Sequence, residues 1–261
     1  MKDSKQPADT HRDPVKTFEG HKDEITSIAT FPDGKRIATG SWDETIRIWR
    51  LADGREMKKW VVKKKVGALL ILRDGKQVVS TEGDDADDDF DRTVYWRLWV
   101  RDVETGRVIA GPLDGHTNMV YALDVSLDGG ILASGSYDCT VILWDTTTWQ
   151  RKGQLLQCGA HVIWVRFSPT GQLGVATKED IQIWDSDQRE RPARFKGHAN
   201  FNKSWNRSLT WTRDGTHLLS AGDGHDPVVR SWDTSTLKQA GDPWAGHDDK
   251  TEILHIILNP A

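Results

Sequence analysis

One four-residue pattern recurs in this chain at fixed spacing and constrains its fold more than any other feature. Each copy has a histidine, a serine or threonine 18 residues later, an aspartate 4 residues further and a tryptophan 6 residues after that. The two copies are His21, Thr39, Asp43, Trp49 and His116, Ser134, Asp138, Trp144. Four residue types at three fixed intervals, found twice, indicate a repeated structural unit.

The segment from Gly115 to Asp145 predicts strands and not helices. It contains three short apolar runs, VYALDV, ILASG and TVILWD, each the length of one strand and rich in β-branched or small residues. Asp128-Gly129 and Tyr137-Asp138 separate the runs, where tight turns favour such residues. With a fourth strand over Gln150–Gln157, the unit is a four-stranded antiparallel meander.

This unit resembles one repeat of the WD-repeat β-propeller family, in which Gly-His and Trp-Asp dipeptides mark repeats of roughly 40–45 residues. Gly115-His116 and Trp144-Asp145 match both dipeptides. The resemblance implies an all-β propeller of four-stranded antiparallel blades. It also implies that the His, Ser or Thr, Asp and Trp of each copy form a buried hydrogen-bonded network within one blade.

The resemblance predicts five complete blades and the first strand of a sixth over residues 15–261, after a flexible polar leader at residues 1–14. A strand over Val15–Glu19 is expected to complete the last blade. Blade five repeats the network residues with longer loops, as His198, Ser220, Asp226 and Trp232. Gly246-His247 and the run EILHIIL begin the sixth repeat. The ring is therefore expected to be open, or truncated from seven blades.

Blades two and four depart from the pattern. Blade four has Cys158 where His116 stands in blade three, so it is expected to hold together mainly by apolar packing. In blade two, the runs VGALLIL, QVVSTE, TVYWRLWV and RVIAGPL supply four strands, but one register places Trp96 in the network and the other places Arg101 there. We favour the Trp96 register, with a bulge or a longer third strand taking up the surplus residues.

An acidic loop at residues 84–91 carries six aspartates in eight residues. It lacks the glycine and the terminal glutamate of a calcium-binding loop, so a solvated insertion is expected. The rest of the chain shows no metal-ligand cluster and no phosphate-binding glycine loop. The sequence therefore predicts neither a metal nor another cofactor.

Composition limits the partners and the compartment. A net charge of -4 disfavours nucleic acid as the main partner. The longest apolar run, VGALLIL, is too short to span a membrane, and the polar N-terminus is unlike a signal peptide. Cys139 and Cys158 are expected to be reduced thiols. We expect an intracellular protein, cytoplasmic or nuclear; the sequence does not indicate its oligomeric state.

The His, Ser and Asp of each network are the residue types of a hydrolase triad. Because they recur once per blade together with a tryptophan, they are interpreted as structural residues, and no catalytic residue is predicted. In the family, partner contacts commonly come from one face, at the residue before the turn Asp and at three and five residues after the Gly-His histidine. The resemblance implies the partner-binding candidates Trp42, Phe90, Met119, Tyr121, Tyr137, Trp205, Arg207 and His225.

Aromatic and arginine side chains are typical of binding hot spots. The sequence therefore predicts a non-catalytic scaffold or adaptor that binds protein or peptide partners through one face of a propeller. Two alternatives remain open. One is a ligand-binding or hydrolytic propeller that uses the acidic loop at residues 84–91. The other is the sensor portion of a larger multidomain signalling protein.

Overall fold

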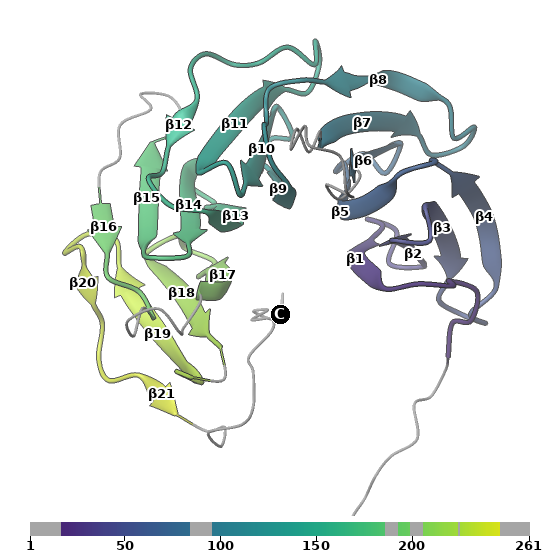
Figure 1. The fold of residues 1–261 in the computed structure, drawn as a ribbon. Helices are drawn as coiled ribbons and strands as arrows, with labels where there is room; N and C mark the ends of the chain where they lie inside the picture. Colours follow the sequence, from purple (N-terminus) through teal and green to yellow (C-terminus); the bar gives the residue numbers. More distant parts are fainter. Residues whose placement is uncertain (1–16, 84–95, 186–192, 199–205, 224, 246–261) are drawn as a thin grey trace, which may run out of the picture.

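The computed structural model describes residues 17–83, 96–185, 193–198, 206–223 and 225–245 of the chain. These residues form twenty-one strands and no helix. The strands assemble into five antiparallel sheets in chain order, called blades one to five below. Figure 1 shows the blades following one another around an open arc, with the first strand of each blade on the inner side. The predicted all-β fold of four-stranded blades is confirmed.

Each blade is a meander of neighbouring strands. Blade one contains β1 (Ile25–Thr30), β2 (Arg36–Ser41), β3 (Thr45–Arg50) and β4 (Glu56–Val61). Blade two contains β5 (Lys65–Ile71), β6 (Gln77–Gly83), β7 (Arg97–Asp102) and β8 (Val108–Leu113). Blade three contains β9 (Val120–Val125), β10 (Ile131–Ser136), β11 (Thr140–Asp145) and β12 (Leu156–Gln157).

The remaining two blades, like blade three, have short outer strands. Blade four contains β13 (Val162–Phe167), β14 (Gln172–Thr177), β15 (Ile181–Asp185) and β16 (Ala193–Phe195). Blade five contains β17 (Asn206–Trp211), β18 (His217–Gly222), β19 (Val228–Asp233) and β20 (Lys238–Gln239), and β21 (Trp244–Ala245) also pairs with β19. The first three strands of the blades carry most of the apolar residues that pack between sheets.

Two predicted strands differ in the structure. The fourth strand of blade three, expected over Gln150–Gln157, is reduced to β12 and one isolated bridge between Trp144 and Arg151. The expected strand over Val15–Glu19 has no strand in its described part, residues 17–19. The predicted sixth-repeat strand EILHIIL lies outside the described residues.

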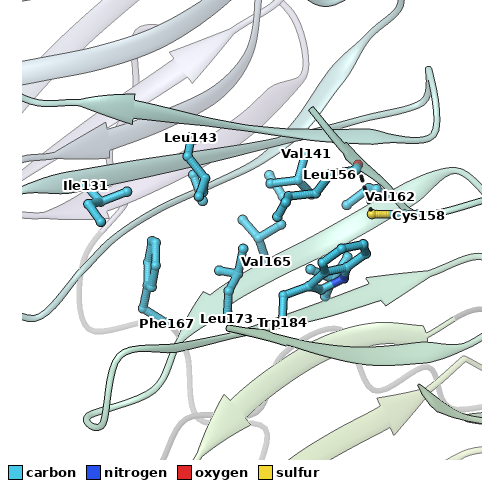
Figure 2. Close-up of a cluster of buried hydrophobic side chains, with 13 residues drawn as sticks. Ile131, Val141, Leu143, Leu156, Cys158, Val162, Val165, Phe167, Leu173 and Trp184 are labelled. Atoms are coloured by element: carbon cyan, nitrogen blue, oxygen red, sulfur yellow. Dashed lines mark hydrogen bonds between the residues drawn. The ribbon is translucent and has the colours of Figure 1, made fainter. Parts of the chain in front are cut away.

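The blades pack closely because glycines admit side chains of the next blade. A Cβ atom at Gly135 would lie 2.5 Å from Cγ1 of Val162, and one at Gly40 would lie 2.5 Å from Cγ1 of Val66. Such distances leave no space for a larger residue at either glycine. Figure 2 shows the resulting core between blades three and four, where Val141 and Leu143 of β11 face Val162, Val165 and Phe167 of β13.

In blade one, no other described blade covers the apolar side chains of the first strand. Ile28 of β1 is 64% exposed, whereas Leu69 and Val165, at the same register in blades two and four, are 6% and 2% exposed. Ile25 is also exposed, whereas its counterpart Val66 is buried. Blade one therefore presents an uncovered apolar surface among the described residues, at one end of the arc.

The register of blade two corrects the prediction that placed Trp96 in the network. Val78 pairs with Arg101 in blade two as Leu132 pairs with Trp144 in blade three, so Arg101 occupies the network position. Strand β7 begins only at Arg97, after the acidic loop has lengthened the connection from β6. Trp96 instead fills the core over Gly67, where an added Cβ would meet its ring at 2.7 Å.

Candidate protein-binding face and the blade networks

Blade three contains a continuous chain of hydrogen bonds through the four predicted network residues. The indole N–H of Trp144 donates to Oγ of Ser134 at 2.9 Å, and Ser134 lies 2.8 Å from Nε2 of His116. Nδ1 of His116 lies 2.9 Å from Asp138, which also accepts from Thr140 and from the Thr117 amide. A neutral imidazole protonated on Nδ1 satisfies every member of this chain.

The same connections occur in blades one and five. In blade one, His21 lies 2.6 Å from Thr39 and 3.0 Å from Asp43, and the indole of Trp49 donates to Thr39 at 2.8 Å. In blade five, the distances are 2.9 Å from His198 to Ser220, 3.0 Å from His198 to Asp226 and 2.8 Å from Trp232 to Ser220. All three sets of residues are therefore brought together as a buried network.

The Asp–His–Ser order within each network is that of a hydrolase triad, but the surroundings exclude that chemistry at these residues. A nucleophilic serine needs an open approach to its oxygen and an oxyanion site beside it. Ser134 is fully buried, and its oxygen already accepts the hydrogen bond of the Trp144 indole. Its counterparts Thr39 and Ser220 are covered in the same way by Trp49 and Trp232.

The network aspartates of blades one and three are held in their charged form. Burial by itself raises the pKa of Asp138, but hydrogen bonds from His116, Thr140 and the Thr117 amide outweigh it and lower the pKa to about 2, from an ordinary 3.8. Burial likewise opposes ionisation of Asp43, whose pKa is lowered by hydrogen bonds from Thr45, the Lys22 amide and His21. The networks of blades one and three therefore depend on an ionised carboxylate.

A pH dependence of stability follows from Asp138. Its pKa is depressed on folding, so its contribution is complete above about pH 4 and is lost as the pH falls toward about 2. We expect Asp138→Asn to melt well below the wild type at pH 6, and this gap in melting temperature to narrow on acidification to pH 3. Melting curves at both pH values measure the gap. A gap that stays constant would contradict the ionised network.

Blade two replaces the network by a buried ion pair. The Arg101 guanidinium donates to Ser80 at 2.9 Å and to both carboxylate oxygens of Glu82. Ser80 in turn donates to Glu82 at 2.5 Å. Burial raises the pKa of Glu82, and the Arg101 charge opposes that rise. The ion pair between Arg101 and Glu82 therefore links β7 to β6 in blade two, in place of the histidine network of blades one, three and five.

Blade four, which is expected to hold together mainly by apolar packing, also contains a buried polar network. Gln182 donates to Asp180 at 2.7 Å and to the Cys158 carbonyl at 2.8 Å, and it accepts the indole N–H of Trp184 at 3.1 Å. Thr177 donates to Asp180 at 2.6 Å. The glutamine amide thus takes over the connections that histidine and serine make elsewhere.

In blades one and three, the predicted partner-contact positions meet at one end of the blade. The backbone N–H of Trp42, before the turn Asp, donates to the carbonyl of Glu24, three residues after His21. The N–H of Tyr137 donates in the same way to the carbonyl of Met119. Both positions therefore lie side by side where β2 meets β3 and where β10 meets β11, and the blades present them on a common face, called the binding face below.

An aromatic cluster crosses the boundary between blades three and four on the binding face. The rings of Tyr121 and Tyr137 have centroids 5.1 Å apart, and Tyr137 stacks on His161 at 4.1 Å with an interplanar angle of 5°. His161 Nδ1 also contacts the Tyr137 carbonyl oxygen. Tyr121 is 44% exposed, and Tyr137 and His161 are half-buried. This cluster is called the tyrosine site below.

A related arrangement joins blades one and two. The Lys65 ammonium lies 5.0 Å from the ring centroid of Trp42, and Trp42 is half-buried. Lys65 and His161 occupy the same position in their blades, three residues after the position of the Gly-His histidine. The sequence did not point to either residue, because blades two and four lack the Gly-His histidine from which the position is counted. Counting three residues from Val62 and from Cys158, which stand in its place, reaches Lys65 and His161.

The other predicted contact residues have mixed placements. Met119 packs against the core between blades two and three, so only part of it is accessible. His225 is exposed in the turn before Asp226. Arg207 lies in β17. Phe90, Trp205 and the acidic loop at residues 84–91 lie outside the described residues.

Two features are absent from the described part of the chain. No helix there is long and apolar enough to cross a membrane. Among the same residues, no group of three or more His, Cys, Asp or Glu side chains is placed to hold a metal ion.

Comparison with known proteins identifies the repeats. The family described as WD domain, G-beta repeat matches residues 12–50, 107–145 and 190–233, which include the networks of blades one, three and five. The rice small ribosomal subunit protein RACK1y is 27% identical over 262 residues, covering 83% of this chain and 76% of that protein. Protein hir1 of Schizosaccharomyces pombe is 25% identical over 245 residues, covering 80% of this chain and 25% of that protein.

A third relative matches a shorter part of the chain. The ribosome biogenesis protein WDR12 homolog of Nematostella vectensis is 32% identical over 138 residues, covering 52% of this chain and 31% of that protein. The chain thus spans about three quarters of the first relative and at most a third of the other two. The chain therefore contains WD-domain, G-beta repeats at three positions, and its four-stranded blades resemble those of a WD-repeat β-propeller.

Proposed function

We propose that this protein is an intracellular, non-catalytic scaffold that binds a protein or peptide partner through the binding face. The tyrosine site is the observation that carries the proposal. Tyr137 stacks on His161 across two blades and Tyr121 packs on Tyr137 at a tilt, at positions where the networks and the cores need no aromatic residue. Rigid aromatic rings that are partly exposed supply contact area at a low cost in side-chain entropy.

The buried networks support the non-catalytic part of the proposal. Their hydroxyl groups are closed to any substrate by the tryptophans that donate to them. The names of two relatives, a small ribosomal subunit protein and a ribosome biogenesis protein, agree with a chain that acts within assemblies. The fold alone does not name the partner, because function resides in the side chains placed on it.

The double variant Trp42→Ala/Tyr121→Ala tests the proposal. Truncating aromatic hot spots costs about 2 kcal/mol of binding free energy or more, roughly a 30-fold loss of affinity. We expect the variant to lose the partner that the wild type captures from its native cells, as measured by quantitative mass spectrometry. The melting temperature of the variant should stay close to that of the wild type.

The matched control is Trp244→Ala. Trp244 is also an exposed aromatic residue, at 60%, but it belongs to β21 at the outer edge of blade five. Its removal should leave the captured partner unchanged. A folded Trp42→Ala/Tyr121→Ala variant that captures the same partner in the same amount would refute the proposed face.

A further inference from the structure

The only two cysteines of the chain lie at opposing positions in blade three. Strand β11 begins at Thr140, which pairs with Gln157 at the end of β12, and the next residue on each side is Cys139 and Cys158. The backbone N–H of Cys158 donates to the carbonyl oxygen of Cys139 at 2.9 Å. Residues opposed in this way have Cα atoms about 5 Å apart, within the range of roughly 4.4–6.8 Å that a disulfide bridges.

The backbone contact between these positions does not depend on cysteine. In blade one the corresponding residues are Glu44 and Val62, and the N–H of Val62 donates to the Glu44 carbonyl oxygen at the same distance of 2.9 Å. The pair in blade three therefore has two thiols where the fold accepts other side chains. Both residues are thiols in this structure.

Both sulfur atoms lie on the side of blade three that faces blade four. Cys158 is buried in the core between these blades, beside Leu156 and Val162, as Figure 2 shows. Cys139 is half-buried, and its Sγ lies 3.6 Å from Nδ1 of His161, the residue before β13. Cys139 is thus the thiol that a dissolved oxidant reaches, and Cys158 is the thiol placed to close a bond to it.

The Cys139 sulfur also contacts the tyrosine site. Nδ1 of His161 lies against this sulfur and against the Tyr137 carbonyl oxygen, and the imidazole stacks on the Tyr137 ring. Any change at the Cys139 sulfur therefore acts on a residue that holds the aromatic surface of the binding face.

We propose that Cys139 and Cys158 are a redox modification site, where a reversible disulfide within blade three draws the Cys139 sulfur away from His161 and shifts the Tyr137–His161 stack. The inference goes beyond the proposed function, because the disulfide and its effect on the stack require no partner.

Hydrogen peroxide supplies the oxidising equivalents in this reaction. The Cys139 thiolate attacks one peroxide oxygen, the O–O bond breaks, and Cys139 becomes a sulfenic acid while the departing hydroxide takes up a proton to form water. The Cys158 thiolate then attacks the sulfenic sulfur, the S–S bond forms, and a second hydroxide leaves as water. Two electrons pass from the two thiols to one peroxide molecule. A dithiol reductant reverses the bond by thiol–disulfide exchange.

The surroundings of Cys139 keep its thiol protonated near neutral pH. Burial and the carboxylates of Asp138 and Glu179 raise the pKa of the Cys139 thiol. Because the thiolate is the nucleophile, oxidation is slow at a low peroxide concentration. The pair is therefore expected to respond to sustained exposure to peroxide and to stay reduced without it.

Peptide mass spectrometry of the full chain tests the disulfide. The protein is exposed to hydrogen peroxide and denatured, and its remaining thiols are alkylated before digestion. Trypsin places the two cysteines in separate peptides, residues 108–151 and 153–166. We expect the oxidised monomer to yield these two peptides joined, and dithiothreitol to separate them. Two thiols that both remain open to alkylation after prolonged exposure, or a linkage found only between two copies of the chain, would overturn the proposal.

Tyrosine NMR tests the effect on the tyrosine site. The chain has three tyrosines, Tyr95, Tyr121 and Tyr137, so ring-labelled tyrosine gives few signals, and Tyr137→Phe assigns the one needed. We expect the Tyr137 signal to move when the wild type is oxidised and to return with dithiothreitol. Cys139→Ser, exposed to the same peroxide, is the control for oxidation elsewhere, and its Tyr137 signal should stay in place. A disulfide that forms without moving the wild-type signal would overturn the link to the tyrosine site.

Discussion

Replacing His116 by alanine is expected to lower the free energy of unfolding by about 2–4 kcal/mol, because the substitution leaves two buried partners incomplete. Asp138 loses the imidazole N–H at 2.9 Å, and Ser134 loses the nitrogen that lies 2.8 Å from its hydroxyl. The side chain of His116 is fully buried, so a cavity adds to the loss. Urea and thermal denaturation of the full chain measure the effect.

The matched control for this prediction is His225→Ala. His225 is exposed and precedes the network Asp226 without belonging to the network. A surface substitution of this kind usually changes stability by less than about 0.5 kcal/mol. If His116→Ala and His225→Ala melted at the same temperature as the wild type, the networks would not be what ties the blades together.

Replacing Arg101 by methionine is expected to have the larger effect of the two, about 3–5 kcal/mol near neutral pH, because it leaves the Glu82 carboxylate buried without its counter-charge. Glu82 and Arg101 are 3% and 7% exposed, so water cannot replace the lost partner. Burial already raises the pKa of Glu82. Without Arg101, that pKa rises further, and the carboxyl is neutral over a wider range of pH.

The sign of the pH effect follows from that rise. A carboxyl whose pKa is raised on folding stabilises the fold while it is protonated and loses this contribution as the pH increases. The deficit of Arg101→Met relative to the wild type should therefore be smaller at pH 5 than at pH 8. The double variant Arg101→Met/Glu82→Leu should recover most of the stability at both values. A double variant as unstable as Arg101→Met at pH 8 would contradict the ion-pair account.

Blades one, three and five were predictable because their hydrogen bonds require particular side chains at particular separations. His116 can reach Ser134 and Asp138 only if those residues lie at fixed places on β10 and its following turn, so the spacing is visible in the sequence. The loops may vary in length outside these places, as they do before Asn206 in blade five, without hiding the pattern.

Blades two and four were not predictable in the same way because different side chains fill the same positions. Arg101 replaces a tryptophan and Glu82 supplies the acid from the opposite strand, a pairing that becomes visible only once the register is known. The extra residues of the acidic loop place the start of β7 at Arg97, so the spacing of the other blades does not give this register. In blade four, the Gln182 side chain bonds Asp180, the Cys158 carbonyl and the Trp184 indole. No spacing in the sequence marks these hydrogen bonds.

Residue positions in the repeat predicted the members of the binding face, but packing decides which of their side chains are accessible. Counting from the Gly-His histidine found Tyr121 and Tyr137, which do lie together, and Met119, whose side chain turns partly into the core. His161 and Lys65 needed the structure, because their blades have lost the residue from which the count begins. The contact between neighbouring blades is what makes the site, and no single repeat contains it.

The most direct measurement for the binding face is site-specific photo-crosslinking in the native cell. A benzophenone amino acid replaces Tyr121 in one variant and Trp244, which is exposed on the outer edge of blade five, in the other. We expect a discrete crosslinked protein from position 121 and none from position 244, with both variants melting like the wild type. Crosslinking of the same protein from position 244 with none from position 121 would contradict it.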